Sequence, residues 1–180
     1  MRIIAGSRKS RQIESLKGTS TRPTLDKVKE AVFSSLHTRI DNSKGLDLFA
    51  GSGNIGLEAL SRGARSVTFI EGAKDAYQLV LRNIKALDFE NVAQVYHMDV
   101  FHALRFLKAK HLIFDWVYCD PPYGKIDIHK VLDKLVELTH EKSMIIVEEK
   151  DEVRVDHPKY TLEKSVHYGQ VVINYIRRLP

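Results

Sequence analysis

The sequence lacks the features that mark several classes of protein. It holds a single cysteine, Cys119, so no intrachain disulfide can form and a reducing, cytoplasmic location is expected. Its longest strictly aliphatic stretch, Met144–Val147, is far shorter than the ~20 residues that span a bilayer, so no membrane association is expected. The N-terminus turns polar by Ser7, so no secretion signal is expected. The eight histidines and one cysteine show no paired metal-ligand spacing, so no metal site is expected.

The composition is that of an ordinary globular protein. Of 180 residues, 43% are hydrophobic and 28% are charged, with ten glycines and five prolines. A chain of this length can bury a full core without a disulfide or a metal, and its composition excludes disordered, collagen-like and low-complexity proteins. We expect a single domain over residues 1–180, made of a basic arm (1–22), a helix (24–40) and an α/β core (45–180).

The net charge of +5 is concentrated at the N-terminus. Residues 1–30 hold eight basic and three acidic side chains, whereas residues 31–180 hold 20 of each sign. A basic segment on an otherwise neutral body is typical of a nucleic-acid contact. A charged arm that only faces water is the alternative, and the charge pattern alone leaves both open.

The first forty residues predict a small hairpin followed by a helix. Residues 2–4 and 11–13 have strand-like patterns on either side of a turn. Thr24 can cap a helix over residues 24–40, whose apolar positions recur at steps of three and four. Three charged side chains lie off this apolar stripe and are expected to be exposed or to face a partner: Lys27, Lys29 and Glu30.

From residue 45 on, short apolar strands alternate with amphipathic helices. Strands are expected at residues 46–50, 67–70, 92–96, 114–119 and 144–147. Repeated strand–helix units require a parallel sheet with helices on both faces. Two further strands at 162–166 and 171–176 are joined by a tight turn and are therefore antiparallel. A seven-stranded, mostly parallel sheet with such a C-terminal pair is the architecture of class I (Rossmann-like) methyltransferases.

A glycine-rich motif follows the first of these strands. Gly51-Ser52-Gly53-Asn54-Ile55-Gly56 matches G-x-G-x-x-G between a strand and a helix, where the backbone can approach a nucleotide-like ligand closely. Glu71 ends the second strand, 20 residues after Gly51, where a carboxylate could accept both ribose hydroxyls. A tight turn is the alternative. The pattern predicts a nucleoside cofactor but does not separate a dinucleotide from S-adenosylmethionine.

The tetrapeptide Asp120-Pro121-Pro122-Tyr123 does separate them. It follows the fourth strand and resembles the motif of methyltransferases that modify planar exocyclic amines: adenine N6, guanine N2 or a glutamine amide. The lone pair of such an amine is delocalised. The Asp120 carboxylate and the Pro121 carbonyl can accept both N–H bonds and turn that lone pair toward the methyl group. The prolines fix the loop, and Tyr123 offers a face for an extruded base.

Less specific interpretations of this region remain open. The tetrapeptide could be a proline turn with a structural aromatic residue. Cys119, which precedes it, is expected to be a buried small hydrophobe rather than a nucleophile, and Trp116 is expected in the core.

Over essentially its whole length, the chain resembles the RsmD family, bacterial guanine-N2 methyltransferases of small-subunit (16S) ribosomal RNA. The strings that carry the resemblance are Arg2–Gly6, Arg22-Pro23-Thr24 with Val28-Lys29-Glu30, Asp47–Gly53, Gly56–Gly63 and Asp120–Tyr123. The N-terminal strings are the specific ones, because adenine or glutamine methyltransferases with the same tetrapeptide do not carry them.

The resemblance implies a role for each site residue. S-adenosylmethionine would be the cofactor, with its ribose at Glu71, its adenine near Asp99 and Val100, and further contacts from Asp47, Phe49, Gly51 and Gly53. The catalytic pocket for the target base would consist of Asp120, Pro121, Pro122 and Tyr123. The expected RNA contacts are Arg8, Lys9 and Arg11 in the arm, and Arg22, Thr24 and Lys27 at the start of the first helix.

The expected function is therefore S-adenosylmethionine-dependent methylation of a guanine N2 in 16S ribosomal RNA. The partner would be ribosomal RNA or the small ribosomal subunit, and the enzyme is expected to be a monomer. The alternatives are an adenine-N6 or glutamine-N5 methyltransferase, a non-catalytic RNA-binding relative and, at the level of the fold alone, a nicotinamide oxidoreductase.

Overall fold

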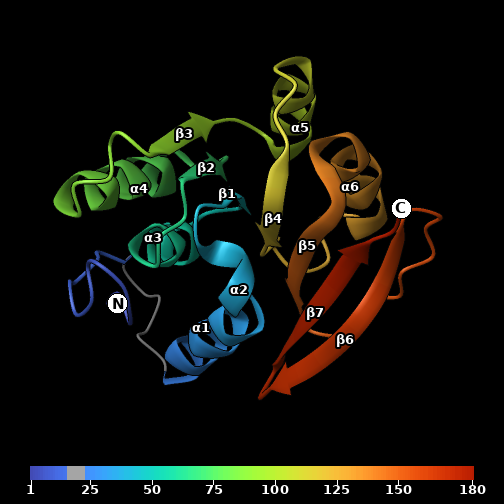
Figure 1. Ribbon diagram of the computed structural model, residues 1–180, viewed down its shortest axis with the longest axis horizontal. Helices are drawn as coiled ribbons and strands as arrows, with labels where there is room; N and C mark the ends of the chain where they lie inside the picture. Colours follow the sequence, from blue (N-terminus) through green and yellow to red (C-terminus); the bar gives the residue numbers. More distant parts are fainter. Residues whose placement is uncertain (16–22) are drawn as a thin grey trace.

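Seven strands form one mixed sheet in the order β3-β2-β1-β4-β5-β7-β6 (Figure 1). The computed structural model describes residues 1–15 and 23–180, with side chains of the second range described from residue 26. The strands are β1 Lys44–Leu48, β2 Ser66–Glu71, β3 Ala93–His97, β4 Phe114–Cys119, β5 Thr139–Glu149, β6 Tyr160–Tyr168 and β7 Val171–Arg178. Strands β1 to β5 pair in parallel, and β7 is antiparallel to both β5 and β6. The predicted class I methyltransferase sheet is confirmed.

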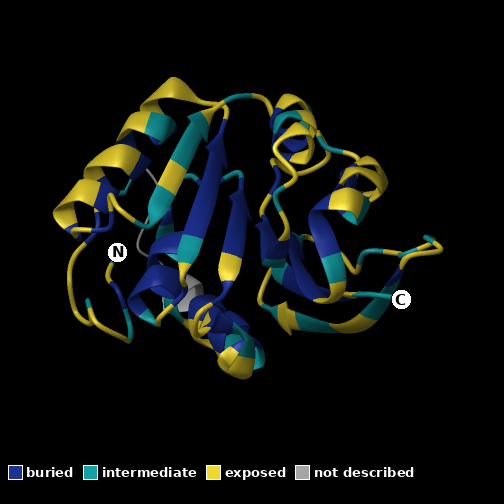
Figure 2. Ribbon diagram, turned by 45° about the horizontal axis from the view of Figure 1, so that its top comes forward, coloured by how far each residue is buried: buried dark blue, intermediate teal, exposed yellow. Residues whose placement is uncertain are grey.

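Helices cover both faces of this sheet. They are α1 Pro23–Ser35, α2 His37–Ile40, α3 Asn54–Ser61, α4 Lys74–Ala86, α5 Val100–Ala109 and α6 Ile128–Leu135. Apolar side chains of α1 to α4 share one core cluster with Phe69 and Trp116. Those of α5 and α6, which lie side by side, share the other with Leu48 and Val117 (Figure 1). The central strands are mostly buried, the edge strands β3 and β6 are mostly intermediate or exposed, and the outer faces of the helices are exposed (Figure 2). As predicted, Trp116 and Cys119 lie in the core.

Strand order also fixes where a ligand can enter. The chain runs outward from β1 to β2 and β3, then returns to β4 on the other side of β1. Neighbouring connections therefore leave β1 and β4 in opposite directions, and a crevice opens at the carboxyl ends of these strands. None of the described helices is both long enough and apolar enough to pass through a bilayer.

The N-terminal arm, residues 1–15, forms the predicted hairpin with a single antiparallel bridge between Arg2 and Gln12. Ile3 and Ile13 are buried in the core cluster of α1 to α4. At the tip, Gly6 has a φ of 84°, and a Cβ there would lie 1.7 Å from the Ser61 carbonyl oxygen. The arm is thus fixed closely against the end of α3. Residues 16–22 of the predicted arm, including Arg22, lie outside the described residues.

The single helix predicted over residues 24–40 is wrong in one respect. Helix α1 begins at Pro23, a favoured first helical residue, and the helix is interrupted at Leu36, before α2 begins. Leu36 has φ −90° and ψ 0°, and its carbonyl accepts from Arg39 N–H at 2.7 Å, a tighter turn than an α-helix makes. The break keeps Leu36 buried and turns Ile40 into the same core.

Candidate active site

Two adjoining cavities open at the carboxyl ends of the central strands. The larger cavity has a volume of about 570 Å³, and its lining includes Glu71, Asp99, Val100 and the segment Asp120–Tyr123. The smaller has a volume of about 210 Å³, and its lining includes Lys29, Asp47, Gly51, Ser52 and Asn54. Three residues line both cavities: Phe49, Asp120 and Glu148. The structure therefore brings the predicted cofactor and target-base residues together around one cleft.

The glycine-rich loop borders open space in this cleft. Gly51 and Gly53 have φ angles of 58° and 79°, which side chains rarely adopt, and a Cβ on Gly51 would meet no atom within 4 Å. Helix α3 starts directly after the loop, so its free backbone N–H groups face the same space. Phe49 also has a positive φ, 62°, a strained conformation of the kind found at functional sites.

Asp47, in β1, supports the helix that follows this loop. Its carboxylate is 2% exposed and accepts a hydrogen bond from Gly56 N–H at 3.0 Å, in the first turn of α3. Desolvation by burial raises the pKa of Asp47 to about 8, against the lowering effect of that hydrogen bond, with a further rise from the charge of Glu71. Asp47 therefore fixes the start of α3 as well as lining the smaller cavity.

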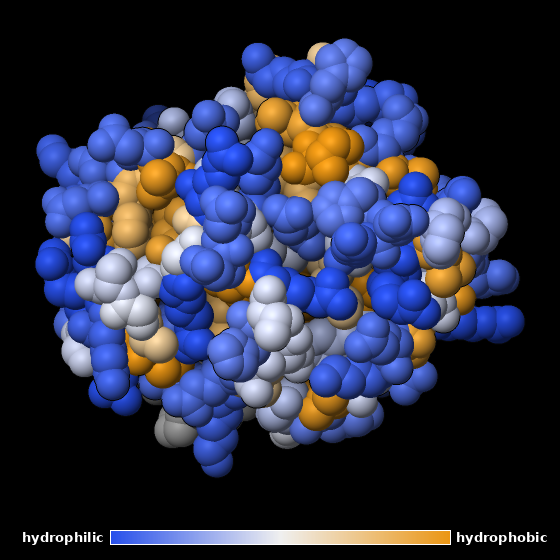
Figure 3. Space-filling view, viewed as in Figure 1, coloured by the Kyte–Doolittle hydropathy of each residue, from blue (hydrophilic) through white to orange (hydrophobic). Residues whose placement is uncertain are grey.

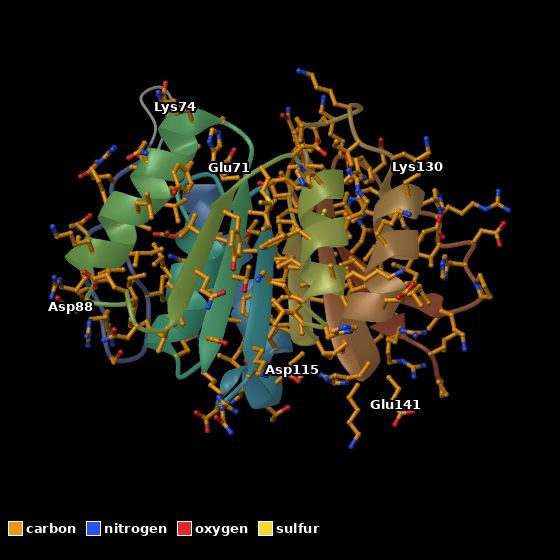
Figure 4. The ribbon with its side chains drawn as sticks, turned by 90° about the horizontal axis from the view of Figure 1, so that it is seen from above. Glu71, Lys74, Asp88, Asp115, Lys130 and Glu141 are labelled. Atoms are coloured by element: carbon orange, nitrogen blue, oxygen red, sulfur yellow. The ribbon has the colours of Figure 1, made fainter. Side chains whose placement is uncertain are left out.

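Glu71 connects β2 to the glycine-rich loop. One carboxylate oxygen accepts from Gly51 N–H and the other from Ala73 N–H, both at 2.8 Å. Figure 4 shows Glu71 at the end of the sheet opposite Asp115. Each carboxylate oxygen keeps lone-pair capacity for a further donor, so Glu71 can still accept ribose hydroxyls.

The next strand end supplies the expected adenine contacts. Asp99 caps α5 by accepting from Phe101 N–H at 3.0 Å and from His102 N–H at 3.2 Å. Its neighbour Val100 is buried and lines the larger cavity. An acidic residue at each of two strand ends, with an apolar wall and open glycine backbone between them, fits the adenosine part of S-adenosylmethionine.

The tetrapeptide Asp120–Tyr123 forms the opposite wall of the larger cavity. The Pro122 carbonyl accepts from Lys125 N–H at 3.1 Å, which closes a turn around Tyr123. The Tyr123 ring is 40% exposed, and the Lys150 ammonium nitrogen lies 5.1 Å from its centre. The ring thus offers an accessible aromatic face beside a cation.

Asp120 is accessible from the cleft, yet its environment disfavours its charge. Desolvation by the surrounding protein raises the pKa of Asp120 to about 8, and the nearby charges of Glu148, Asp47 and Glu149 raise it further in that order. A carboxylate with a raised pKa in a cleft is typical of a reaction centre.

Glu148, near the end of β5, is a site residue that the sequence analysis did not single out. It is 8% exposed and accepts a hydrogen bond from the Tyr118 hydroxyl at 2.5 Å. Burial raises the pKa of Glu148, against the lowering effect of this hydrogen bond. The predicted fifth strand ended at Val147, so a rule that acidic residues just past parallel strands line the ligand crevice would have found it.

Lys29 was predicted to be exposed or to face a partner, and the structure shows that it is buried, with 1% exposure. Its ammonium lies 3.2 Å from the Glu58 carboxylate and donates to the Arg2 carbonyl at 2.6 Å and to Asn54 Oδ1 at 2.8 Å. Desolvation lowers the pKa of Lys29, and the charge of Glu58 opposes this. Helical periodicity placed Lys29 off the stripe of α1, but the N-terminal arm covers that side.

Two of the arginines predicted to bind RNA have partners within the protein. Arg8 Nε donates to the Leu87 carbonyl at 2.7 Å, and Arg11 Nη2 donates to the Ala86 carbonyl at 2.6 Å. They satisfy free carbonyls at the end of α4, which runs away from Glu71 (Figure 4).

The other predicted RNA contacts divide into two kinds. Lys9 and Lys27 are exposed, so they are accessible to a partner. The side chain of Thr24 and all of Arg22 lie outside the described residues.

Hydrophilic side chains dominate the face of the molecule that Figure 3 shows, with apolar patches between them.

Comparisons with known proteins identify the family. A family model described as Conserved hypothetical protein 95 matches residues 1–177. A Haemophilus influenzae protein named Ribosomal RNA small subunit methyltransferase D is 37% identical over 177 residues, which cover 95% of this chain and 90% of that protein. The chain belongs to the RsmD family. The resemblance seen in the sequence is confirmed.

Solved structures support the same fold. The protein yhhF from Escherichia coli is 31% identical, with a TM-score of 0.87, and the match covers 99% of this chain and 98% of that one. A methyltransferase-type structure, SMU.776 complexed with SAH, has a TM-score of 0.68 and 19% identity, and the match covers 83% of this chain and 49% of that one. At this identity the second likeness shows the fold alone.

Proposed function

We propose that this protein transfers a methyl group from S-adenosylmethionine to the exocyclic N2 amine of a guanine in 16S ribosomal RNA. The observation that carries the proposal is the Asp120-Pro121-Pro122-Tyr123 turn after β4, which lines the larger cavity and contributes Asp120 to the smaller one as well. The family relative from Haemophilus influenzae named Ribosomal RNA small subunit methyltransferase D supports the RNA substrate, and the SAH in SMU.776 supports the cofactor.

The cofactor-facing residues would each hold one part of the ligand. When bound, S-adenosylmethionine supplies an electrophilic methyl group on a positively charged sulfur. Glu71 would accept the ribose hydroxyls, and Asp99 with Val100 would bind the adenine. The backbone of the Gly51–Gly53 loop and the N–H groups at the start of α3 would lie along the remainder.

The residues of the tetrapeptide would prepare the amine. The Asp120 carboxylate and the Pro121 carbonyl accept its two N–H bonds, so the nitrogen lone pair points away from them toward the methyl group. Tyr123 stacks on the extruded base, a contact worth ~1–3 kcal/mol. Orientation and fixed charges in the cleft then supply most of the rate enhancement.

The proposal extends to the protein's surroundings. We propose that it works as a single-domain monomer in the cytoplasm, on ribosomal RNA or on the small ribosomal subunit, without a metal and away from membranes. Lys9 and Lys27, which are exposed, would contact RNA together with Arg22 and Thr24. Arg8 and Arg11 could reach RNA only in addition to their contacts with α4.

Methyl transfer into ribosomal RNA tests the proposal. The protein is incubated with tritiated S-adenosylmethionine and with unmodified 16S ribosomal RNA or small subunits, and the labelled nucleoside is then identified. N2-methylguanosine at one position is the expected product. N6-methyladenosine, or label in a protein glutamine, would contradict the proposed substrate. Cofactor binding without transfer to any of them would favour the non-catalytic relative.

A further inference from the structure

Glu148 lies beside Asp120 on the same face of the sheet. Strands β4 and β5 pair in parallel with Tyr118 opposite Ile146 and Cys119 opposite Val147, so the register continues to Asp120 and Glu148. Alternation along a strand places Tyr118 and Asp120 on one face, and Ile146 and Glu148 on that same face. The hydrogen bond from the Tyr118 hydroxyl to Glu148 confirms this orientation.

Among the described residues three glutamates are buried, and Glu148 is the one whose carboxylate has neither a cation nor a backbone N–H as partner. Glu71 accepts from Gly51 N–H and Ala73 N–H. Glu58, 0% exposed, is paired with Lys29 and Arg62. Among residues 1–15 and 26–180, no lysine, arginine or histidine lies within ion-pair distance of Glu148. A buried carboxylate without a counter-ion is expensive unless a proton or a positive ligand compensates it. The cleft shared with Asp120 is where either can arrive.

We propose that Glu148 is the second carboxylate of the reaction centre and that, together with Asp120, it takes up the proton that the target amine loses on methylation. The inference rests on the proposed methyl transfer to an exocyclic amine. In that reaction the nitrogen lone pair forms the bond to the methyl carbon, and the electron pair of the broken carbon–sulfur bond stays on sulfur. The nitrogen then carries a positive charge, and one N–H proton passes to Asp120.

The carboxyl pair balances the charge before and after this step. With one shared proton, Asp120 and Glu148 carry a single negative charge, which faces the positively charged sulfur of the bound donor. After transfer the sulfur is neutral, and the proton from the amine neutralises the pair. The second proton then leaves to solvent through the open cleft. Asp120 alone would have to hold this proton without a neighbour to share it.

The pKa values agree with a shared proton. Burial raises the pKa of Glu148, and desolvation followed by the charge of Glu148 raises that of Asp120 to about 8. The charges of Asp47 on β1 and Glu149 on β5 also raise the pKa of Asp120, whereas the hydrogen bond from Tyr118 on β4 opposes the rise at Glu148. Two lysines are found in this region, and each has another partner: Lys29 on α1 is paired with Glu58, and the Lys150 ammonium lies over the Tyr123 ring.

Glu148→Gln tests this role, because it removes the charge and keeps an acceptor for the Tyr118 hydroxyl. We expect kcat to fall by ~100-fold, within the range for positioned acid–base groups. Loss of a like charge lowers the pKa of Asp120, so the acid limb of the kcat/KM profile moves to lower pH. Glu141→Gln, an exposed glutamate earlier in the same strand and outside both cavities, is the control and should leave kcat near the wild-type value.

A binding measurement separates the proposal from activity. Calorimetry in two buffers of different ionisation enthalpy measures the protons released when a ligand binds. Near neutral pH, S-adenosylmethionine should release more of a proton from the wild-type protein than S-adenosylhomocysteine, whose sulfur carries no charge, and Glu148→Gln should abolish this difference. Glu148→Asp, which keeps a carboxylate, should retain part of it.

The outcomes distinguish the possible roles. A Glu148→Gln variant with wild-type kcat, or with a lower kcat but an unmoved acid limb and unchanged proton release, would overturn the proposal in favour of a packing role. If the wild-type protein binds S-adenosylmethionine but methylates no amine, the proposed function fails, and the proton-release comparison still shows whether the two carboxyls share a proton. Equal release with both ligands would overturn that sharing.

Discussion

Replacing Glu58 by glutamine should release the N-terminal arm from the rest of the fold. The Glu58 carboxylate is 0% exposed and accepts from Ile4 N–H at 2.8 Å and from Ala5 N–H at 3.0 Å. The same carboxylate pairs with Lys29 at 3.2 Å and with Arg62 at 2.8 Å. A glutamine keeps one acceptor but turns an N–H₂ group toward these donors. Four donors then compete for one oxygen, and the Lys29 ammonium loses its counter-ion while buried.

The size of the effect follows from this loss. Removing one partner of a buried ion pair costs about 3–5 kcal/mol. For a domain of this size, each kcal/mol corresponds to a fall in Tm of roughly 2–4 °C. Urea unfolding followed by circular dichroism measures the free energy of unfolding directly. Glu141→Gln, an exposed glutamate in β5 (Figure 4), is the matched control and should change it by less than ~0.5 kcal/mol.

A second variant tests the reason for the loss. In Lys29→Met/Glu58→Gln the uncompensated ammonium is gone, so the double variant should be less destabilised than Glu58→Gln alone. The arm also lines the smaller cavity through Met1, next to Lys29. Cofactor affinity should therefore fall in the single variant even at temperatures where it is folded. A loss of less than about 1 kcal/mol in Glu58→Gln would refute the assignment of this cluster as the anchor of the arm.

Five further predictions concern the cleft and the RNA. Asp120→Ala should lose most turnover while cofactor affinity, measured by calorimetry, stays within a few-fold. Tyr123→Phe should reduce turnover only slightly and Tyr123→Ala strongly, because stacking needs the ring. Equal loss of turnover in both Tyr123 variants would point to the hydroxyl. Because Asp120 must be ionised to accept from the amine, kcat/KM should rise with pH up to about 8, and a profile flat between pH 6 and pH 8 would contradict its raised pKa. Glu71→Ala should weaken S-adenosylmethionine tenfold or more, since charge-assisted hydrogen bonds contribute ~1.5–3 kcal/mol, and competition by a nicotinamide nucleotide would revive the oxidoreductase alternative. Neutralising Lys9 and Lys27 should reduce the salt dependence of RNA binding by roughly 0.7 per lost contact on single strands, whereas a wild-type slope would exclude these two lysines from the RNA interface.

Most of the sheet could be predicted because each strand is short, apolar and bounded by polar or glycine residues. The bounds of β4, Phe114–Cys119, are those expected from the sequence. β5, by contrast, was expected only at residues 144–147 and extends over Thr139–Glu149. In its polar first half only Thr139 pairs with β4, and this half does not show the regular alternation of buried and exposed residues that a sequence pattern can detect.

The residues of the candidate site could be predicted where they belong to a motif with a known chemical role. They could not be predicted where the role of a single residue depends on how the chain packs around it. Gly51 and Asp120 belong to patterns with a fixed place in the fold, and both line the cleft. In the sequence Lys29 has the position of an exposed helical lysine, and only the packing of the N-terminal arm buries it. Glu148 has the position of a polar residue at the end of a strand. Arg8 was counted as free positive charge, although its guanidinium is bound to the end of α4. Long-range contacts of this kind leave no local trace in the sequence.

The position of β7 has a consequence for how the protein is made. β7 follows every other strand in the chain, yet it lies inside the sheet, between β5 and β6. During synthesis β5 therefore remains an unpaired edge until Val171–Arg178 have emerged from the ribosome. The buried Asn174, which accepts from Val153 N–H at 2.9 Å and donates to the Val147 and Asp151 carbonyls, then fixes the segment that follows Glu148. The strand that pairs with the Glu148 end of β5, and so supports one wall of the cleft, is thus the last of the described strands to be synthesised.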